Sequence, residues 1–283
     1  ESNHKLSDLM PIYEETSESP YISKFEISLK AGQMFIIDGI PVGTLYAVKE
    51  DTGKYLSYID GVLNEDAEIH GHIESGDNSI VYMNTEKTEL KVKKVWDDAD
   101  DQDGLRANVI TVELVKVVEE LIDGELKKKD VLTGKTLDLN QENGWTATFA
   151  NLPKFDVDGS KIEWKVAEIN LDKYQYISKI EREEQTINGK QEVTFIITNS
   201  HTPETVNISG EKIWNDINNQ DGKRPESIVV KLFANGEEVS SKTVTAEDGW
   251  KWTFENLPKF YNHGTPIAYT FVETGIGETG YSI

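Results

Sequence analysis

The chain has 283 residues, enough for two or three domains, and its 51 acidic against 29 basic residues give a net charge of −22, which makes nucleic acid and anionic membranes poor partners. It contains no cysteine, which excludes disulfides, zinc–thiolate sites and cysteine nucleophiles. No apolar run is long enough to span a bilayer, so the sequence predicts no membrane insertion.

The first predicted unit, residues 1–86, reads as short alternating strands separated by Gly, Asn, Asp and Pro. Two of these strands, 46–50 and 80–84, end in Glu50 and Asn84. Successive side chains of a strand point to opposite faces, so each of these polar residues shares a face with the aromatic and aliphatic residues two and four positions earlier. The sequence therefore predicts that both point toward the core.

The second predicted unit, residues 87–203, places three polar residues on apolar strand faces. Lys94, Glu168 and Asn199 each share a face with aromatic or aliphatic residues two positions away. The sequence thus predicts that a lysine, a glutamate and an asparagine meet in one core. A charged insertion at 117–133 predicts a longer hairpin with a solvated tip.

The third predicted unit, residues 204–283, repeats the landmarks of the second. KVWDD at 94–98 returns as KIWND at 212–216, DQDGLR at 101–106 as NQDGKR at 219–224, and NLPKF at 151–155 as NLPKF at 256–260. Lys212 and Glu273 repeat the lysine and the glutamate, but the position that matches Asn199 falls beyond Ile283. We therefore expect Lys212 and Glu273 to form an ion pair or to reach water.

The recurrence of these landmarks at nearly constant spacing indicates three related units, joined by short linkers at 85–87 and 200–205. No long stretch shows helical periodicity. The pattern is typical of an all-β chain, a string of β-sandwiches.

Two interpretations fit the inward-pointing Lys94, Glu168 and Asn199. The first is a buried ion pair with a hydrogen-bonded asparagine, since buried charges must be paired. The second is a self-made amide bond. Burial disfavours the charged form of a lysine and of a carboxyl group, so the lysine can act as a neutral nucleophile and the carboxyl group can carry protons. The product is an intramolecular Lys–Asn isopeptide bond, which requires no cofactor or metal.

The repeated motifs, together with the ITN sequence at 197–199, resemble the B-type repeats of Gram-positive collagen adhesins, the CnaB-like domains that also occur in pilins. The resemblance covers the second and third units almost end to end, and the first unit resembles a related pilin-type domain. It implies immunoglobulin-like β-sandwiches. It also implies an isopeptide bond between Lys94 and Asn199 that Glu168 assists.

The resemblance carries over in part to the other units. It implies assisting roles for Glu50 and Glu273, an acceptor role for Asn84, and an unpaired role for Lys212 in this chain. The first unit lacks a tryptophan-marked first strand, and its best lysine is Lys5, which lies 20 residues before Phe25 as Lys94 lies 20 before Leu114.

Family members are stalks of cell-wall-anchored adhesins or pili, so the resemblance implies an extracellular, Gram-positive surface protein that is monomeric and flanked by further domains. The alternative is a region that binds a host matrix protein such as collagen, which would need an exposed apolar patch. An enzyme is disfavoured, because each unit holds a single candidate glutamate. No metal site is predicted, since His70 and His72 share a strand face without a third ligand.

Overall fold

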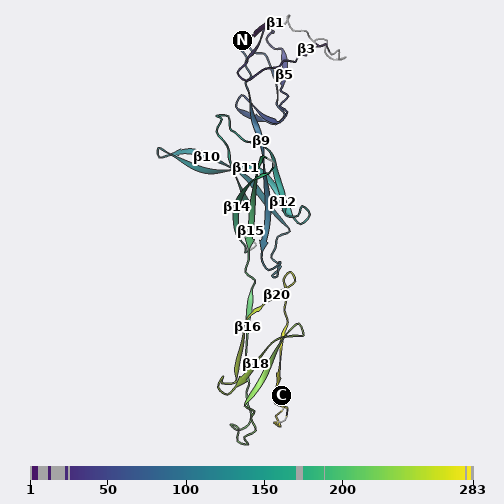
Figure 1. Cartoon of the computed structure of the whole chain (residues 1–283), viewed down its shortest axis with the longest axis vertical. Helices are drawn as coiled ribbons and strands as arrows, with labels where there is room; N and C mark the ends of the chain where they lie inside the picture. The colour runs from purple at the N-terminus through teal and green to yellow at the C-terminus, as the bar shows by residue number, and fades with distance from the viewer. Residues whose placement is uncertain are drawn as a thin grey trace. The chain divides into compact units, whose positions relative to one another are not determined.

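The computed structural model of the chain is built from strands (Figure 1). It describes residues 2–5, 12–13, 23–24, 26–169, 175–187, 189–277 and 279–281. Within these ranges there is no helix, so the all-β prediction is confirmed, and no helix has the length and apolar character that a membrane crossing requires. The chain divides into two compact units, one made of residues 1–88 and 151–162 and the other of 89–150 and 163–283.

The first compact unit contains short paired strands. They are β1 (Ser2–Lys5) parallel to β4 (Phe35–Asp38), β2 (Ile12–Tyr13) with β3 (Ser23–Lys24), β5 (Leu45–Lys49) with β8 (Glu68–His72), and β6 (Tyr55–Ile59) with β7 (Val62–Asn64). The long strand β9 (Tyr82–Asp97) begins here, where Tyr82–Glu86 pairs with β6. The prediction of a linker at 85–87 is therefore wrong. These residues belong to β9, because Thr85 and Glu86 are paired with residues of β6.

In the second compact unit, residues 89–150 and 163–203 form two sheets. One contains β10 (Val109–Ile122), β11 (Glu125–Asn140) and β13 (Glu163–Ile169), and the other contains the end of β9, β12 (Thr146–Pro153), β14 (Ile177–Ile187) and β15 (Lys190–Ser200). Strand β15 lies parallel to β9, so the first and last strands of this part are neighbours. The predicted core alternation is confirmed along β15, where every second residue from Val193 to Asn199 is buried.

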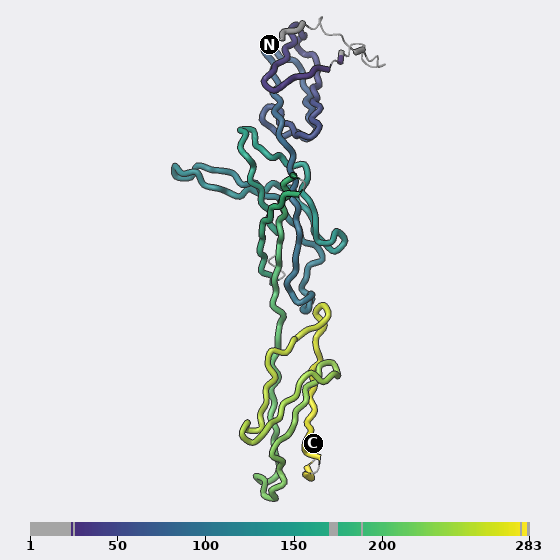
Figure 2. The backbone as a smooth tube through the Cα atoms, in the orientation of Figure 1, coloured from purple at the N-terminus to yellow at the C-terminus, as the bar shows by residue number. Residues whose placement is uncertain are grey.

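The predicted hairpin insertion is confirmed. Strands β10 and β11 pair as far as Ile122 and Glu125 and turn at Asp123 and Gly124, both with positive φ. Figure 2 shows this hairpin extending away from the neighbouring strands. Its charged residues form surface ion pairs such as Lys129–Glu120, with Nζ and Oε2 2.8 Å apart.

Residues 204–281 repeat the two-sheet arrangement with fewer strands. The strands are β16 (Thr205–Glu211) with β19 (Lys251–Pro258), β17 (Ser227–Ala234) between β18 (Glu237–Thr245) and β22 (Tyr269–Thr274), and the small pair β20 (Phe260–Tyr261) and β21 (Thr265–Pro266). Buried residues from both sheets form one core, among them Val230, Leu232 and Phe254. Among the described residues of this part, no strand takes the places of β14 and β15.

Candidate functional site

Three strands bring Lys94, Glu168 and Asn199 together in the middle part of the chain. Lys94 lies on β9 beside Ile197 of β15, and Asn199 follows two residues later on the same face of β15. Glu168 reaches them from β13 in the opposite sheet. The side chains of Lys94 and Glu168 are 0% and 2% exposed, and Asn199 is fully buried. The meeting that strand parity predicted is therefore present.

Lys94 is a buried amine with few polar partners. Its Nζ lies 3.9 Å from Glu168 Oε1, beyond hydrogen-bonding distance, and makes only long hydrogen bonds of 3.3 and 3.4 Å to the backbone oxygens of Ile197 and Val95. The Trp96 ring covers it, with 4.5 Å between Nζ and the ring centroid. Burial lowers the pKa of Lys94 to about 8 against the opposing attraction of Glu168 and Asp98. A sizeable fraction of this amine is therefore neutral near pH 7.

Glu168 is held at both carboxylate oxygens. Asn199 Nδ2 donates a hydrogen bond of 2.7 Å to Oε1, and Ser178 Oγ donates one of 2.7 Å to Oε2. The Asn199 Oδ1 atom is buried and finds no hydrogen-bond partner among the described residues. This arrangement aligns the amide with the carboxylate through its nitrogen.

The sequence analysis missed Ser178. Strand β14 places it directly opposite Asn199 on β15. A signal was present, because the same Tyr-aliphatic-Ser pattern occurs at 55–57 and at 176–178, a few residues after the strand-end glutamate in both units. Parity arguments on the strand of Glu168 could not reveal it, since the serine comes from a different sheet.

The first unit contains a similar cluster in a more open setting. Glu50 Oε1 accepts a hydrogen bond of 2.7 Å from Asn84 Nδ2, and Oε2 accepts one of 2.6 Å from Ser57 Oγ. The prediction that Asn84 points into the core is wrong, because Asn84 is exposed and its neighbour Thr85 is buried instead, with its hydroxyl on the backbone of Phe155. The side chain of Lys5 lies outside the described part of the chain, so its role stays a prediction.

The third repeat pairs its lysine and glutamate directly. Lys212 Nζ lies 2.8 Å from Glu273 Oε2, with the two side chains 15% and 14% exposed. The Trp214 ring again covers the amine, at 5.0 Å from Nζ to the centroid. The other carboxylate oxygen of Glu273 is buried without a hydrogen-bond partner among the described residues. This geometry is an ion pair, one of the two outcomes expected from the sequence.

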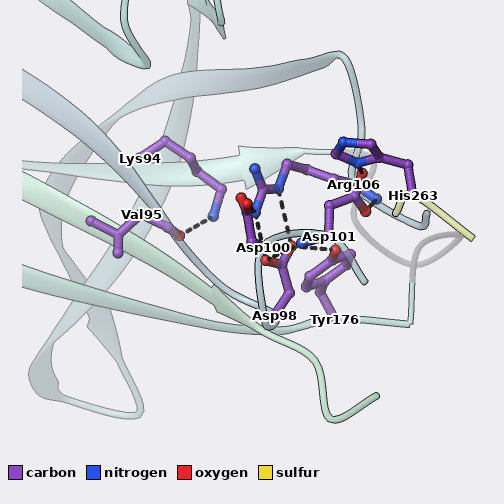
Figure 3. A network of polar contacts seen from close by, with 8 residues as sticks. All are labelled: Lys94, Val95, Asp98, Asp100, Asp101, Arg106, Tyr176 and His263. Atoms are coloured by element: carbon purple, nitrogen blue, oxygen red, sulfur yellow. Dashed lines mark hydrogen bonds and ion pairs between the residues drawn. The ribbon is translucent and has the colours of Figure 1, made fainter. Parts of the chain in front are cut away.

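A buried aspartate organises the motif that follows Trp96, and Figure 3 shows it between Arg106 and Tyr176. Asp98 accepts hydrogen bonds from Arg106 Nε at 3.1 Å, from Arg106 Nη2 at 2.6 Å, and from the Tyr176 hydroxyl at 2.8 Å. Burial would raise the pKa of Asp98, but the hydrogen bonds from Arg106 and Tyr176 outweigh it and lower that pKa. Residues 98–106 are thereby held beside Trp96 and the lysine.

The third repeat contains the same network. Asp216 accepts hydrogen bonds of 2.9 and 2.6 Å from Arg224 and one of 2.7 Å from the Tyr281 hydroxyl. Trp214 packs edge-on against Trp250 and Tyr281, as Trp96 packs against Trp145 and Tyr176. Tyr281 therefore occupies the place of Tyr176, eight residues after the glutamate in both repeats.

The loop that carries Asp101 also contacts the turn at 262–264. His263 Nδ1 lies 2.9 Å from Asp101 Oδ2, as Figure 3 shows, and the Gly264 amide donates to the Gln102 oxygen. A Cβ at Gly104 would lie only 2.5 Å from the His263 carbonyl oxygen, so this close approach requires glycine.

No metal centre emerges from the described ranges, which bring no group of three or more His, Asp or Glu side chains close enough to hold an ion. The candidate site therefore consists of the amine, the carboxylate, the amide and the hydroxyl.

Comparisons with known proteins match two stretches of the chain to one family. The family model described as Cna protein B-type domain matches residues 90–200 and 208–283. The collagen adhesin of Staphylococcus aureus is 40% identical over 187 residues, which is 66% of this chain but 14% of that protein, so the chain spans only a small part of this relative.

Two solved structures of B repeat units are similar to this chain, and the first shares its fold. The crystal structure of two B repeat units of the collagen binding protein of Staphylococcus aureus is 30% identical, covers 82% of this chain and 68% of its own, and has a TM-score of 0.53. A single B repeat unit of that protein is 34% identical and covers 68% of this chain and 88% of its own, with a TM-score of 0.28.

Proposed function

Because the chain belongs to the family of Cna protein B-type domains, we propose that it is a structural region of a bacterial surface adhesin whose residues 87–203 lock themselves with an isopeptide bond. The bond joins Lys94 Nζ to Asn199 Cγ, and Glu168 assists. The observation that carries this proposal is the burial of all three side chains in one core, with the lysine outside hydrogen-bonding distance of the carboxylate.

The reaction needs only these groups. The neutral amine of Lys94 attacks Asn199 Cγ, and the carboxylate of Glu168 takes a proton from the attacking nitrogen and returns it to Nδ2. The Cγ–Nδ2 bond then breaks and ammonia leaves, so one C–N bond forms and one is lost. Folding holds the amine and the amide in one core, which supplies the proximity that two separate molecules would lack.

Intact-protein mass spectrometry tests the proposal. The protein should weigh less than its sequence by the mass of one ammonia for each bond, and trypsin should release a branched peptide that joins the strands of Lys94 and Asn199. A protein with its full sequence mass would contradict the proposal.

The rate of bond formation should depend on pH. Since the pKa of Lys94 is about 8, the neutral fraction of its amine rises about tenfold per pH unit below that value and levels off above it. Unreacted chains would be made by cell-free synthesis and kept in denaturant, which prevents folding. They would be diluted into buffers from about pH 6 to 9, the reaction stopped with acid, and the loss of ammonia measured from the mass of the intact protein. A rate that does not change between pH 6 and 8 would argue against a neutral-amine nucleophile.

In a protein made of residues 1–283, the third repeat should be cleaved first by proteases. It has an ion pair where the middle part has the candidate bond, and β16 pairs only with β19 among the described strands. Limited proteolysis should begin after Pro203, while 87–203 survives. Initial cleavage within 87–203 would contradict this order.

The same proposal extends to location and partners. A surface adhesin of a Gram-positive bacterium would be extracellular and anchored in the cell wall, and its B-type units would join flanking domains of the same chain and remain monomeric. The first-unit bond, with Glu50, Asn84 and Lys5, stays a prediction from the resemblance. Asn84, unlike Asn199, is exposed.

One observation favours a second candidate function, binding to a host matrix protein such as the collagen in the name of the relative. The β10–β11 hairpin exposes Leu121, Leu126 and Leu132, at 67%, 69% and 58%. Apolar side chains gathered on a protruding hairpin can form a binding surface. The third repeat joins its matching strands by a short turn at Asn235 and Gly236, which offers a design for removing the surface.

Replacing residues 117–133 by an Asn-Gly turn should leave the sandwich folded and abolish binding to immobilised collagen if this hairpin is the binding surface. Equal binding by the parent and the shortened protein would exclude the hairpin, and no binding by either would exclude this function for the region.

A further inference from the structure

A serine faces the glutamate and the asparagine in both clusters that contain an asparagine. Ser178 Oγ lies 2.7 Å from Glu168 Oε2, and Ser57 Oγ lies 2.6 Å from Glu50 Oε2. Each serine is the direct cross-strand partner of the asparagine, with Ser178 opposite Asn199 and Ser57 opposite Asn84. Two clusters on different strands thus share the contacts of one carboxylate with a serine hydroxyl and an asparagine Nδ2. They differ at the amide oxygen, because Ser57 Oγ also lies 2.7 Å from Asn84 Oδ1, whereas Asn199 Oδ1 has no partner among the described residues.

We propose that Ser178 is a positioning residue for the isopeptide reaction, because together with Asn199 it occupies both carboxylate oxygens of Glu168 and so keeps Lys94 out of hydrogen-bonding contact with that carboxylate. This inference rests on the proposed function of the middle part and adds to it a residue and a role.

In the described part of the third repeat, the glutamate carboxylate contacts the lysine instead of a serine and an asparagine. Glu273 has no serine or asparagine on its carboxylate among the described contacts, and Lys212 Nζ approaches it to 2.8 Å. In the middle part the corresponding distance between Lys94 Nζ and Glu168 Oε1 is 3.9 Å. Each lysine lies under its tryptophan ring, but the described part of the third repeat has no strand in the places of β14 and β15, and the side chain of Lys212 is 15% exposed against 0% for Lys94. The occupation of the carboxylate is thus a clear difference between the two sites.

Whether the carboxylate is occupied affects the protonation of the neighbouring lysine. A lysine in contact with a carboxylate is held as the ammonium, which cannot attack an amide. With both oxygens of Glu168 occupied, burial dominates at Lys94 and favours its neutral form. The Ser178 hydrogen bond also fixes the rotation of the carboxylate, so Oε1 lies between the lysine nitrogen and Asn199 Nδ2, the two atoms that exchange a proton through it.

Two variants of equal shape test the proposal. Ser178→Thr keeps the hydroxyl, whereas Ser178→Val replaces it by a methyl group, and both residues suit a strand. Ser200→Ala is the matched control, because Ser200 lies on β15 and bonds Asp97 at 3.3 Å, outside the cluster. Ammonia loss would be followed by mass after refolding from denaturant across the pH range, and near-ultraviolet circular dichroism would check the packing of each variant.

We expect Ser178→Thr and Ser200→Ala to match the parent. In Ser178→Val the freed Oε2 should bind Lys94, so the midpoint of the pH–rate curve should move up by about one unit and the rate at pH 7 should fall about tenfold. A Val variant with the rate and midpoint of the Thr variant would overturn the role of Ser178 while leaving the bond intact. If the parent protein itself loses no ammonia, the proposed function fails instead.

Discussion

Lys94→Ala is expected to abolish the loss of one ammonia that the parent shows at this site. It should also lower the unfolding free energy of the middle part by about 4–5 kcal/mol. The candidate bond closes a loop from residue 94 to residue 199, and in the chain-entropy model a crosslink over about 100 residues stabilises by that amount through the unfolded state. Chemical denaturation followed by tryptophan fluorescence, with Trp96 in the core of this part, measures the loss.

Glu168→Gln supplies the control for this result. It keeps the size of the side chain and leaves Lys94 in place, but it removes the group that carries the proton. It should therefore lose the bond without the cavity that alanine creates. Agreement between the two variants assigns the loss of stability to the crosslink. If Lys94→Ala keeps the ammonia deficit of the parent, another lysine forms the bond and the assignment is wrong.

Asp98→Ala should destabilise the middle part by about 3–5 kcal/mol, the usual result of removing one member of a buried charge pair. The Asp98 side chain is 1% exposed, and its loss leaves both the Arg106 guanidinium and the Tyr176 hydroxyl without their acceptor. Asp100→Asn is the control on the same loop, since the Asp100 side chain is 98% exposed and lies 3.7 Å from Arg106 Nη2, and asparagine tolerates the positive φ of this position. It should change stability by no more than about 0.5 kcal/mol.

The effect of Asp98 should also depend on pH. The pKa of Asp98 is lower in the folded protein than in the unfolded chain, so ionised Asp98 stabilises the fold above the ordinary aspartate value of about 3.9. That contribution is lost as pH falls through the folded pKa. The difference in stability between the parent and Asp98→Ala should therefore shrink below about pH 4. A difference that stays constant down to pH 2 would show that packing, rather than charge, is responsible.

Much of the middle site could be read from the sequence because β-strands impose a strict period of two. The parity of Lys94, Glu168 and Asn199 placed each side chain on an apolar face, and the structure brings the three together. The all-β fold and the hairpin at 117–133 followed from equally local signals.

Other features depended on pairing between distant strands, which parity cannot supply. Ser178 belongs to the site only because β14 lies in register against β15. Asn84 is exposed because Thr85 occupies the inner position on β9, where its hydroxyl meets the backbone of Phe155. Likewise, the spacing of Asp98 and Arg106 marked the motif, but only the structure shows the bidentate contact between them.

The parallel arrangement of β9 and β15 has a consequence for how far the chain can lengthen. The chain enters along β9 and leaves along β15, and the candidate bond joins these two neighbouring strands between residues 94 and 199. The roughly 100 residues between them, fully extended, would measure about 350 Å. A covalent link between residues 94 and 199 would prevent the residues between them from extending under load. This part of the chain would then act as a spacer of fixed length.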